Sequence, residues 1–418
     1  ALGRKTGHGA VGAYQSISKR FKWLGWLGIA AAALIFSFYS ALGGYCLRYV
    51  VVNFGNLIGA EFGTNGVGGA DVFQGLLSQP DVSIAFALAF MFITMLVVMS
   101  GVGGGIERVC SVGMPALFFI LIICIIRSCT LPGAADGLKY MFVPGWAVAN
   151  GIIDEAPGFW RVLTAAGGQM FFSLSLGAGV MITYGSYLDK KQDLGKSTMI
   201  IVGMDTVVAL MAGLCVIPGR FALDPNGALG GPELLFITMQ NVFDKMGPAG
   251  PVFGILFYLL VFFAAISSSI SMLEVIVAHF CDKAREKGKG DRRKLYSAIV
   301  VVICAALCAL VCADGMGSNH ISPAELLGLA GAKLPGWSTS WLGLFDSVAE
   351  GLLMPLGALL MCLMISWELK PDVLRQEILL NGENRPWVYD FFRLCVKYIT
   401  PLCMLMILYG QISDFFIA

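Results

Sequence analysis

Long apolar stretches separated by short connections run through the whole sequence. A helix that crosses a bilayer needs about 20 mainly apolar residues. Windows of that kind lie at 24–50, 81–103, 106–131, 161–188, 197–218, 251–280, 295–313, 341–368 and 388–416. The pattern therefore predicts an all-α polytopic membrane protein with nine transmembrane spans in a single domain over 1–418.

Composition strengthens this prediction. The chain is 57% hydrophobic and only 13% charged, and its mean hydropathy is +0.78. Because soluble domains are about 25% charged, a soluble core of this size is excluded. We expect the lipid bilayer to surround the chain.

Positive charges indicate which side of the membrane each connection faces, because cytoplasmic connections keep an excess of Lys and Arg. Segment 1–23 carries five such residues, 189–196 carries three, 282–294 carries seven and 53–80 carries none. We therefore expect 1–23 to be a cytoplasmic loop. Nine crossings then put the C-terminus on the extracellular or periplasmic side.

The sequence lacks the residue clusters of an enzyme or a nucleic-acid-binding protein. Twelve Cys residues form no CxxC pair, so neither a zinc site nor a disulfide framework is indicated. His8, His279 and His320 are scattered, and the net charge is only +1. We expect no enzymatic activity, no organic cofactor and no nucleic acid partner. The absence of Asn-x-Ser/Thr sequons favours a bacterial source and hence the bacterial inner membrane.

The window at 161–188 contains residues that weaken a helix in its middle. In GGQMFFSLSLGAGVMITYGSY (167–187), four of the seven residues from Ser173 to Gly179 are Ser or Gly. Small residues in a span favour close helix packing. The alternative is an unwound span, whose freed backbone groups must line a cavity and bind something polar. The stretch permits a break without requiring one.

Two further polar features lie inside apolar windows. FFAAISSSISMLE (262–274) holds four serines in five residues. Their hydroxyls are hard oxygen donors suited to an alkali cation, although serines in a span also bond back to the preceding helical turn. Asp205 lies in 197–218, where an ionised carboxylate costs roughly 2.5 to 3.5 kcal/mol on insertion. We interpret it as the partner of a bound cation or proton; a neutral Asp bonded to a neighbouring helix is the alternative.

Four motifs together resemble the neurotransmitter:sodium symporter family, in its bacterial amino acid branch. They are GQMFFSLSLGAG at 168–179, ITYGSYL at 182–188, SSSIS at 267–271 and GIERVCSVGMP at 105–115. The similarity extends over essentially all 418 residues, and the opening ALGRKTGHGAVGAY resembles the segment after the family's second helix. The resemblance implies an inverted-repeat fold of five plus five helices. Nine of about eleven spans are then present, and the first two are expected to be missing from this chain.

The resemblance also implies two sodium ions. Ser173 and Asp205 would contribute to the first site. The carbonyl of Ala264 and the hydroxyls of Ser267 and Ser268 would contribute to the second. Further ligands are expected from the family's first helix.

The family comparison bears on chloride as well. Asp205 stands where the family commonly has Asn. Ala209, four residues later, stands where chloride-dependent members have Ser and many chloride-independent members have Glu. We therefore expect Asp205 to supply the negative charge that removes a need for chloride.

A substrate pocket follows from the same resemblance. Tyr39 is expected to donate its hydroxyl to an amino acid carboxylate, and Phe172 to close over the substrate side chain. The set expected to line the pocket is Ile35, Tyr39, Phe172, Ser173, Ser175, Ala178, Ser268 and Met272. Without the motifs, a Tyr or Phe in a span indicates only a core residue or an interfacial anchor.

Gating positions and an outer cap complete the family comparison. Gly105 and Pro115 delimit a segment whose opening would let water reach the second sodium site from the cytoplasm, although Pro115 is also a simple kink candidate. Asp346 or Glu350 belongs to an external gate or is a solvated loop charge. Segment 219–250 resembles the family's extracellular helical hairpin.

The implied function is sodium-coupled symport of an amino acid, neutral and hydrophobic or aromatic, across the plasma membrane by alternating access. A non-transporting amino acid receptor or a channel on the same fold is the alternative, since sequence separates these poorly. The expected partners are the amino acid, Na⁺ and the bilayer. The sequence indicates no particular oligomeric state.

Ala178 generates a prediction about substrate size. A larger apolar residue stands here in the leucine-transporting member of the family, so the smaller side chain leaves room for a bulkier substrate. One buried methylene is worth about 0.8 kcal/mol. In a competition panel, Trp, Tyr, Phe or Leu should outcompete Gly and Ala for uptake. A panel won by glycine or by a charged amino acid would contradict the expectation.

Overall fold

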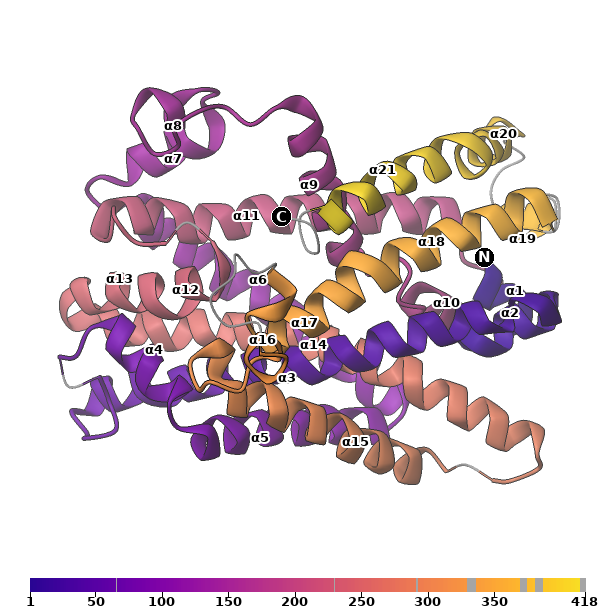
Figure 1. Ribbon diagram of the computed structural model, residues 1–418, viewed down its shortest axis with the longest axis horizontal. Helices are drawn as coiled ribbons and strands as arrows, with labels where there is room; N and C mark the ends of the chain where they lie inside the picture. The colour runs from indigo at the N-terminus through magenta and orange to yellow at the C-terminus, as the bar shows by residue number, and fades with distance from the viewer. Residues whose placement is uncertain are drawn as a thin grey trace. The chain divides into compact units, whose positions relative to one another are not determined.

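The computed structural model describes residues 1–64, 66–228, 230–290, 292–328, 336–368, 374–379 and 386–413. Throughout these residues the regular secondary structure is helical (Figure 1). A helix satisfies its own backbone hydrogen bonds, which lipid cannot do. An apolar chain of this kind therefore folds as helices wherever it is to cross a bilayer.

Eight long apolar helical segments lie in eight of the nine predicted windows. They are built from α3 (Lys22–Ile58), α5 (Pro80–Met99), α6 (Glu107–Cys129), α11 (Leu194–Leu223), α14 (Gly250–Glu286), α15 (Arg293–Asp314), the pair α17 (Trp341–Asp346) and α18 (Met354–Leu363), and the pair α20 (Pro386–Leu394) and α21 (Thr400–Ile412). The ninth window, 161–188, is divided into α9 (Phe159–Ser173) and α10 (Val180–Gly185). Residues 414–416 of the last window lie outside the described part.

Shorter elements occupy the connections or form irregular turns within the long apolar segments. They are α1 (Leu2–Thr6), α2 (Ala10–Ile17), η1 (Lys19–Phe21), α4 (Gly69–Leu77), η2 (Val102–Ile106), α7 (Ala134–Phe142), α8 (Trp146–Ala149), α12 (Gly231–Glu233), η3 (Leu234–Thr238), α13 (Met239–Lys245), η4 (Gly247–Ala249), η5 (Gly315–Gly317), α16 (Pro323–Leu326), η6 (Gly336–Ser338), η7 (Ser347–Leu353), η8 (Met364–Glu368), α19 (Arg375–Leu379) and η10 (Cys395–Ile399). Segment 1–23 is thus itself largely helical. Its cytoplasmic location stays a prediction.

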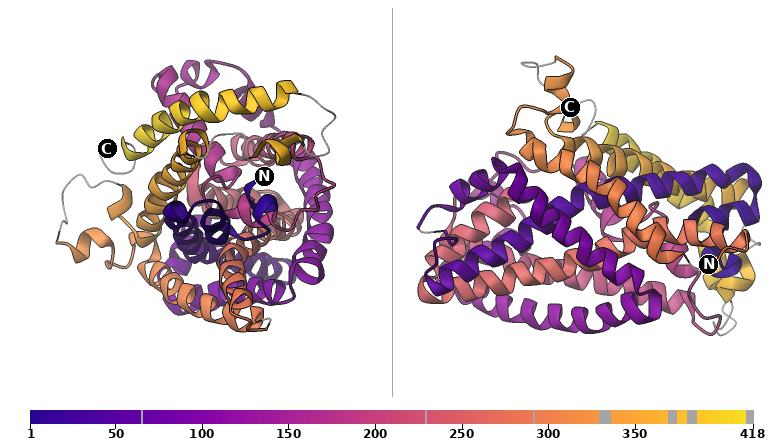
Figure 2. Two further views of the ribbon diagram at one scale, coloured as in Figure 1. Left: turned by 90° about the vertical axis from the view of Figure 1, so that its right-hand side faces the viewer. Right: turned by 90° about the horizontal axis from the view of Figure 1, so that it is seen from below.

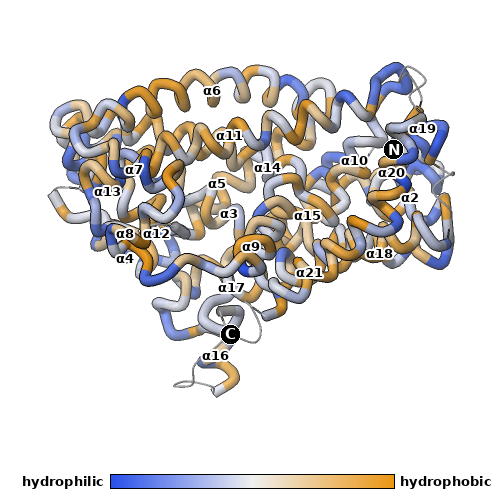
Figure 3. Tube along the Cα trace, turned by 90° about the horizontal axis from the view of Figure 1, so that it is seen from above, coloured by the Kyte–Doolittle hydropathy of each residue, from blue (hydrophilic) through white to orange (hydrophobic). Residues whose placement is uncertain are grey.

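Helix α6 shows why these segments suit lipid. Val112, Phe119 and Ile126 expose more than half of their surface, and the trace of α6 is apolar along most of its length (Figure 3). Exposed apolar side chains on a soluble protein would be unfavourable in water. In a bilayer the same face contacts acyl chains at no such cost.

The described residues group into two compact units. The first contains Ala1–Phe38, Gly158–Asp205 and Ser269–Ala418, and the second contains Tyr39–Pro157 and Thr206–Ser268. Three of the four boundaries fall within α3, α11 and α14, and the fourth lies in the connection before α9. Each of these three helices therefore contributes one part to each unit.

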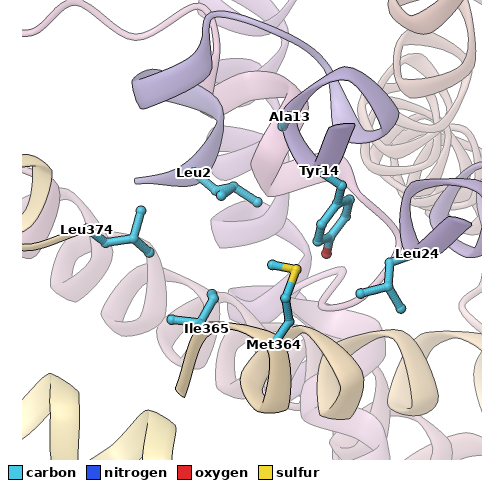
Figure 4. Packing of buried hydrophobic residues seen from close by; sticks show 7 residues of the cluster. All are labelled: Leu2, Ala13, Tyr14, Leu24, Met364, Ile365 and Leu374. Carbon is cyan, nitrogen blue, oxygen red and sulfur yellow. The ribbon is translucent and has the colours of Figure 1, made fainter. Parts of the chain in front are cut away.

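The first unit has two apolar clusters. In one, Leu2 and Tyr14 of the N-terminal helices pack with Met364 and Ile365 of η8, as Figure 4 shows. In the other, Phe171 of α9 packs against α18 and α21. Helices α18 and α21 lie side by side, seen in orange and yellow in Figure 2. Ile182 of α10 packs on the first cluster and Phe171 of α9 belongs to the second, so both halves of the interrupted span are packed within this unit.

An aromatic cluster forms the core of the second unit. Tyr45 and Tyr49 of α3 pack against Phe236, which also stacks on Phe73 of α4 and on Tyr258 of α14. These rings attach the helical run 231–245 to α3, α4 and α14. The extracellular placement of 219–250 stays a prediction.

Candidate functional site

The first unit contains a helix that is interrupted in the middle of an apolar window. Helix α9 ends at Ser173 and α10 starts at Val180. Between them the backbone turns through positive φ angles at Ser175 (50°), Gly177 (84°) and Gly179 (75°). Of the two interpretations of this stretch, the unwound span is therefore the one observed.

Gly177 holds the interruption against a neighbouring helix. A Cβ atom at this position would collide with the carbonyl oxygen of Met354, the first residue of α18. The positive φ is also costly for any residue with a Cβ. Glycine is thus required here both by the contact with Met354 and by the positive φ. At this one residue the small side chain also serves close helix packing.

Ser173 and Asp205 meet at the end of α9. The Ser173 hydroxyl donates to Oδ1 of Asp205, on α11, across 2.6 Å. Two hard oxygen donors from different helices therefore converge, and a hydroxyl does not neutralise a carboxylate. Within the described part of the chain, no salt bridge includes Asp205.

The first unit also contains five other residues that were predicted to line the substrate pocket. Ala178 is fully buried, and Ile35 of α3 and Met272 of α14 are also buried. Phe172 and Ser175 are half-buried. The backbone of Ala178 lies close to Gly28 of α3, where a Cβ would stand 3.2 Å from the Ala178 carbonyl carbon.

The second unit holds the remaining predicted ligands. In the continuous helix α14, the Ser267 hydroxyl donates to the Ala264 carbonyl across 2.8 Å. This is the back-bonding that serines in spans commonly make, and it also puts two of the predicted sodium ligands beside each other. The Tyr39 hydroxyl and the Ser268 side chain are neighbours. Their roles in substrate binding stay predictions.

The predicted gating residues occupy irregular helical segments. Gly105 lies in the widened turn η2, where a Cβ would collide with the Val97 carbonyl of α5. Pro115 lies inside α6, which continues through it. Asp346 is the last residue of α17 and Glu350 lies four residues later in η7, so their carboxyl groups are neighbours.

A buried charge cluster was not predicted from the sequence. Glu274 of α14 is fully buried and contacts Arg293 of α15 at 2.6 and 3.1 Å, while the Tyr187 hydroxyl donates to it across 2.6 Å. A signal was available, because Glu274 is the only Asp, Glu, Lys or Arg in the window 251–280. Since the cluster supplies its own counter-charge, Glu274 needs no bound ion.

A second ion pair fixes the start of the chain. Arg4 is buried and contacts the Glu377 carboxylate at 2.8 Å. Its guanidinium also donates to the backbone carbonyls of Gln192 and Glu377. Through Arg4, the N-terminal helices are tied to the connection that follows α10 and to α19.

Known proteins resemble the chain over nearly its whole length. A family model described as the sodium:neurotransmitter symporter family matches residues 71–416. YhdH, an uncharacterized sodium-dependent transporter of Bacillus subtilis, is 35% identical over 99% of this chain and 85% of that protein. An uncharacterized sodium-dependent transporter of Haemophilus influenzae is 29% identical over 94% of this chain and 79% of that protein.

A solved structure extends the comparison to three dimensions. The crystal structure of MhsT in complex with L-phenylalanine matches with a TM-score of 0.80 at 31% identity, over 98% of this chain and 86% of the MhsT chain. The likeness supports the all-helical symporter fold that the sequence motifs imply. It leaves the roles of individual side chains as predictions.

Gly177 provides a test of the interrupted helix. Gly177→Ala should abolish or strongly reduce transport for two reasons. The added methyl group must displace the Met354 carbonyl, and the alanine must adopt a left-handed backbone conformation that costs roughly 1 to 2 kcal/mol. Thermal unfolding and uptake are measured together. The matched control is Gly203→Ala in α11, where a Cβ meets no atom within 4 Å. Normal transport by Gly177→Ala would contradict the importance of this contact.

Proposed function

Because the chain belongs to the sodium:neurotransmitter symporter family, we propose that it moves an amino acid together with sodium ions across the plasma membrane by alternating access. The family consists of sodium-dependent transporters, so the chain is a transporter and not an enzyme. No covalent chemistry is required. Transport requires that the binding site opens first to one side of the membrane and then to the other.

The observation that carries the proposal is the interrupted span α9–α10 with the Ser173–Asp205 contact beside it. Unwound backbone in an apolar window is tolerated where it binds something polar. The ionised carboxylate supplies one negative charge, and the hydroxyl supplies a neutral oxygen. This combination suits a sodium ion, which binds hard oxygen ligands.

The second sodium ion would use the oxygen atoms of Ala264, Ser267 and Ser268. Ser267 and the Ala264 carbonyl are already within hydrogen-bond distance of each other. On sodium binding the Ser267 hydroxyl would turn its proton away and present a lone pair to the ion. All three ligands are neutral, so this site would bind sodium more weakly than a site with a carboxylate.

The amino acid would bind beside the interruption. Its carboxylate would accept a hydrogen bond from Tyr39, while backbone carbonyls near Ser173 would accept from its ammonium group. Ile35, Phe172 and Met272 are apolar, and Ala178 is small, so the substrate side chain is proposed to be large and hydrophobic or aromatic. The match to MhsT with L-phenylalanine supports this class.

Two regions are proposed as gates. A loosened turn at η2, together with Pro115, would open a path to the second sodium site from the cytoplasm. On the outer side, the Asp346–Glu350 pair at η7 would respond to closure over the substrate. The orientation expected from the positive charges, with the N-terminus of this chain in the cytoplasm of a bacterial cell, is part of the same proposal.

Sodium-driven uptake is the direct test. Proteoliposomes with an inward sodium gradient should concentrate a labelled hydrophobic amino acid, whereas vesicles with potassium alone, or with equal sodium on both sides, should not. Equal accumulation without sodium would contradict coupling. Sodium-dependent binding with no accumulation would favour the receptor alternative.

Asp205 makes the ionic requirement testable. With chloride replaced by gluconate, the parent should keep its uptake, because Asp205 supplies the negative charge beside the first sodium. Asp205→Asn keeps an oxygen ligand but loses the negative charge beside the first sodium. It should therefore lose uptake by about tenfold or more, or become chloride-stimulated, because one charge–charge interaction near 4 Å is worth roughly 1 to 4 kcal/mol.

The matched control for Asp205→Asn is Asp136→Asn, which removes an exposed carboxylate that pairs with Lys139. Exposed pairs of this kind contribute little, so this variant should transport normally. Strong chloride dependence of the parent would overturn the role given to Asp205.

A further inference from the structure

We propose that a basic pocket in the first unit binds the phosphate-bearing headgroup of an anionic phospholipid. The pocket lies where the end of α14 connects to the start of α15. Its volume is about 310 Å³, and it is lined by Cys281, Arg285, Lys289, Gly290, Arg292 and Arg293. It is separate from the residues assigned to sodium and to the amino acid.

The charge balance around the pocket favours an anion. Segment 282–294 contains seven Lys or Arg and three Asp or Glu. Two of those acids face the N-terminal helices, because Asp282 accepts from the Gly9 amide at 2.8 Å and Glu286 lies 3.8 Å from His8. Four cationic side chains line one concavity, where a bound phosphate group would relieve their mutual repulsion.

The side chains also have suitable chemistry. Three of the four cations are arginines, whose planar guanidinium groups bind phosphate oxygens through paired hydrogen bonds. Lys289 supplies a further point charge. Cytoplasmic surfaces carry anionic lipids, and basic pockets between membrane helices on that side bind their headgroups. The positive charge of the connection predicts that the pocket faces that side.

An apolar stripe on α15 distinguishes a lipid from free phosphate. It starts two residues after Arg293 and consists of Leu295, Ile299, Val302 and Ile303, which are 49%, 45%, 70% and 60% exposed. Their spacing puts them on one side of the helix. A headgroup held in the pocket would lay its acyl chains along this stripe. Inorganic phosphate would make no use of it.

Arg293 connects the pocket to the interior of the unit. The same guanidinium that lines the pocket bonds both carboxylate oxygens of Glu274, which also accepts from Tyr187. A phosphate on the outer side of Arg293 would hold α14 and α15 together without breaking the internal ion pair. Lipid binding should therefore raise the thermal stability of the protein.

The experiment is a titration of the thermal unfolding midpoint of the purified protein in neutral detergent. The probes are a short-chain phosphatidylglycerol, the matching short-chain phosphatidylcholine, and inorganic phosphate. The test variant combines Arg285→Gln, Lys289→Gln and Arg292→Gln and leaves Arg293 intact. The control variant combines Lys190→Gln and Lys191→Gln, in the connection after α10, with Lys196→Gln in the first turn of α11. All three lysines are exposed, and the variant removes the same charge.

Phosphatidylglycerol should raise the midpoint of the parent and of the control variant at equal concentrations. The test variant should need about 100-fold more of it, since each cation near an anionic lipid is worth about fivefold in affinity. An equal response to phosphatidylcholine, or an equal loss in both variants, would overturn the site. A full response to inorganic phosphate would overturn the lipid assignment.

Discussion

Backbone hydrogen bonding in an apolar environment is the constraint on which the rest of the structure depends. Lipid offers no partner to an amide or a carbonyl, so a chain that crosses a bilayer remains helical unless the protein itself covers the break. Residues 174–179 leave the helix in spite of this constraint. They do so through three positive φ angles and a glycine pressed against α18. The polar backbone freed there is what the fold offers to a polar ligand.

Charged side chains in the same unit follow two different patterns. Glu274 is buried with Arg293 and Tyr187 and is balanced within the protein. Asp205 accepts a hydrogen bond from the Ser173 hydroxyl, and no salt bridge among the described residues includes it. The first pattern stabilises helix packing, and removal of one partner would strand a buried charge. The second pattern is consistent with the proposed role of Asp205 as a ligand of the first sodium ion.

The sequence indicated the helices and singled out Asp205, and it permitted the interruption without requiring it, because each of these features leaves a local signal. Apolar windows set the spans, Ser and Gly weaken one of them, and a lone carboxylate in an apolar window is costly. The partners of a buried charge that lie far away in the sequence leave no such signal. Arg293 follows Glu274 by 19 residues, and Tyr187 precedes Glu274 by 87. The contact of Gly177 with Met354 likewise depends on packing, and Ser267 fits both of its interpretations.

Amide hydrogen exchange of the interrupted segment tests the central claim most directly. The protein in nanodiscs is compared in potassium alone and in sodium with a hydrophobic amino acid, for the parent and for Asp205→Asn. The account predicts that exchange slows in peptides covering 171–185 of the parent, and that the effect is largely lost in Asp205→Asn. Unchanged exchange there, while the parent binds its substrate with sodium, would contradict a ligand site at the break.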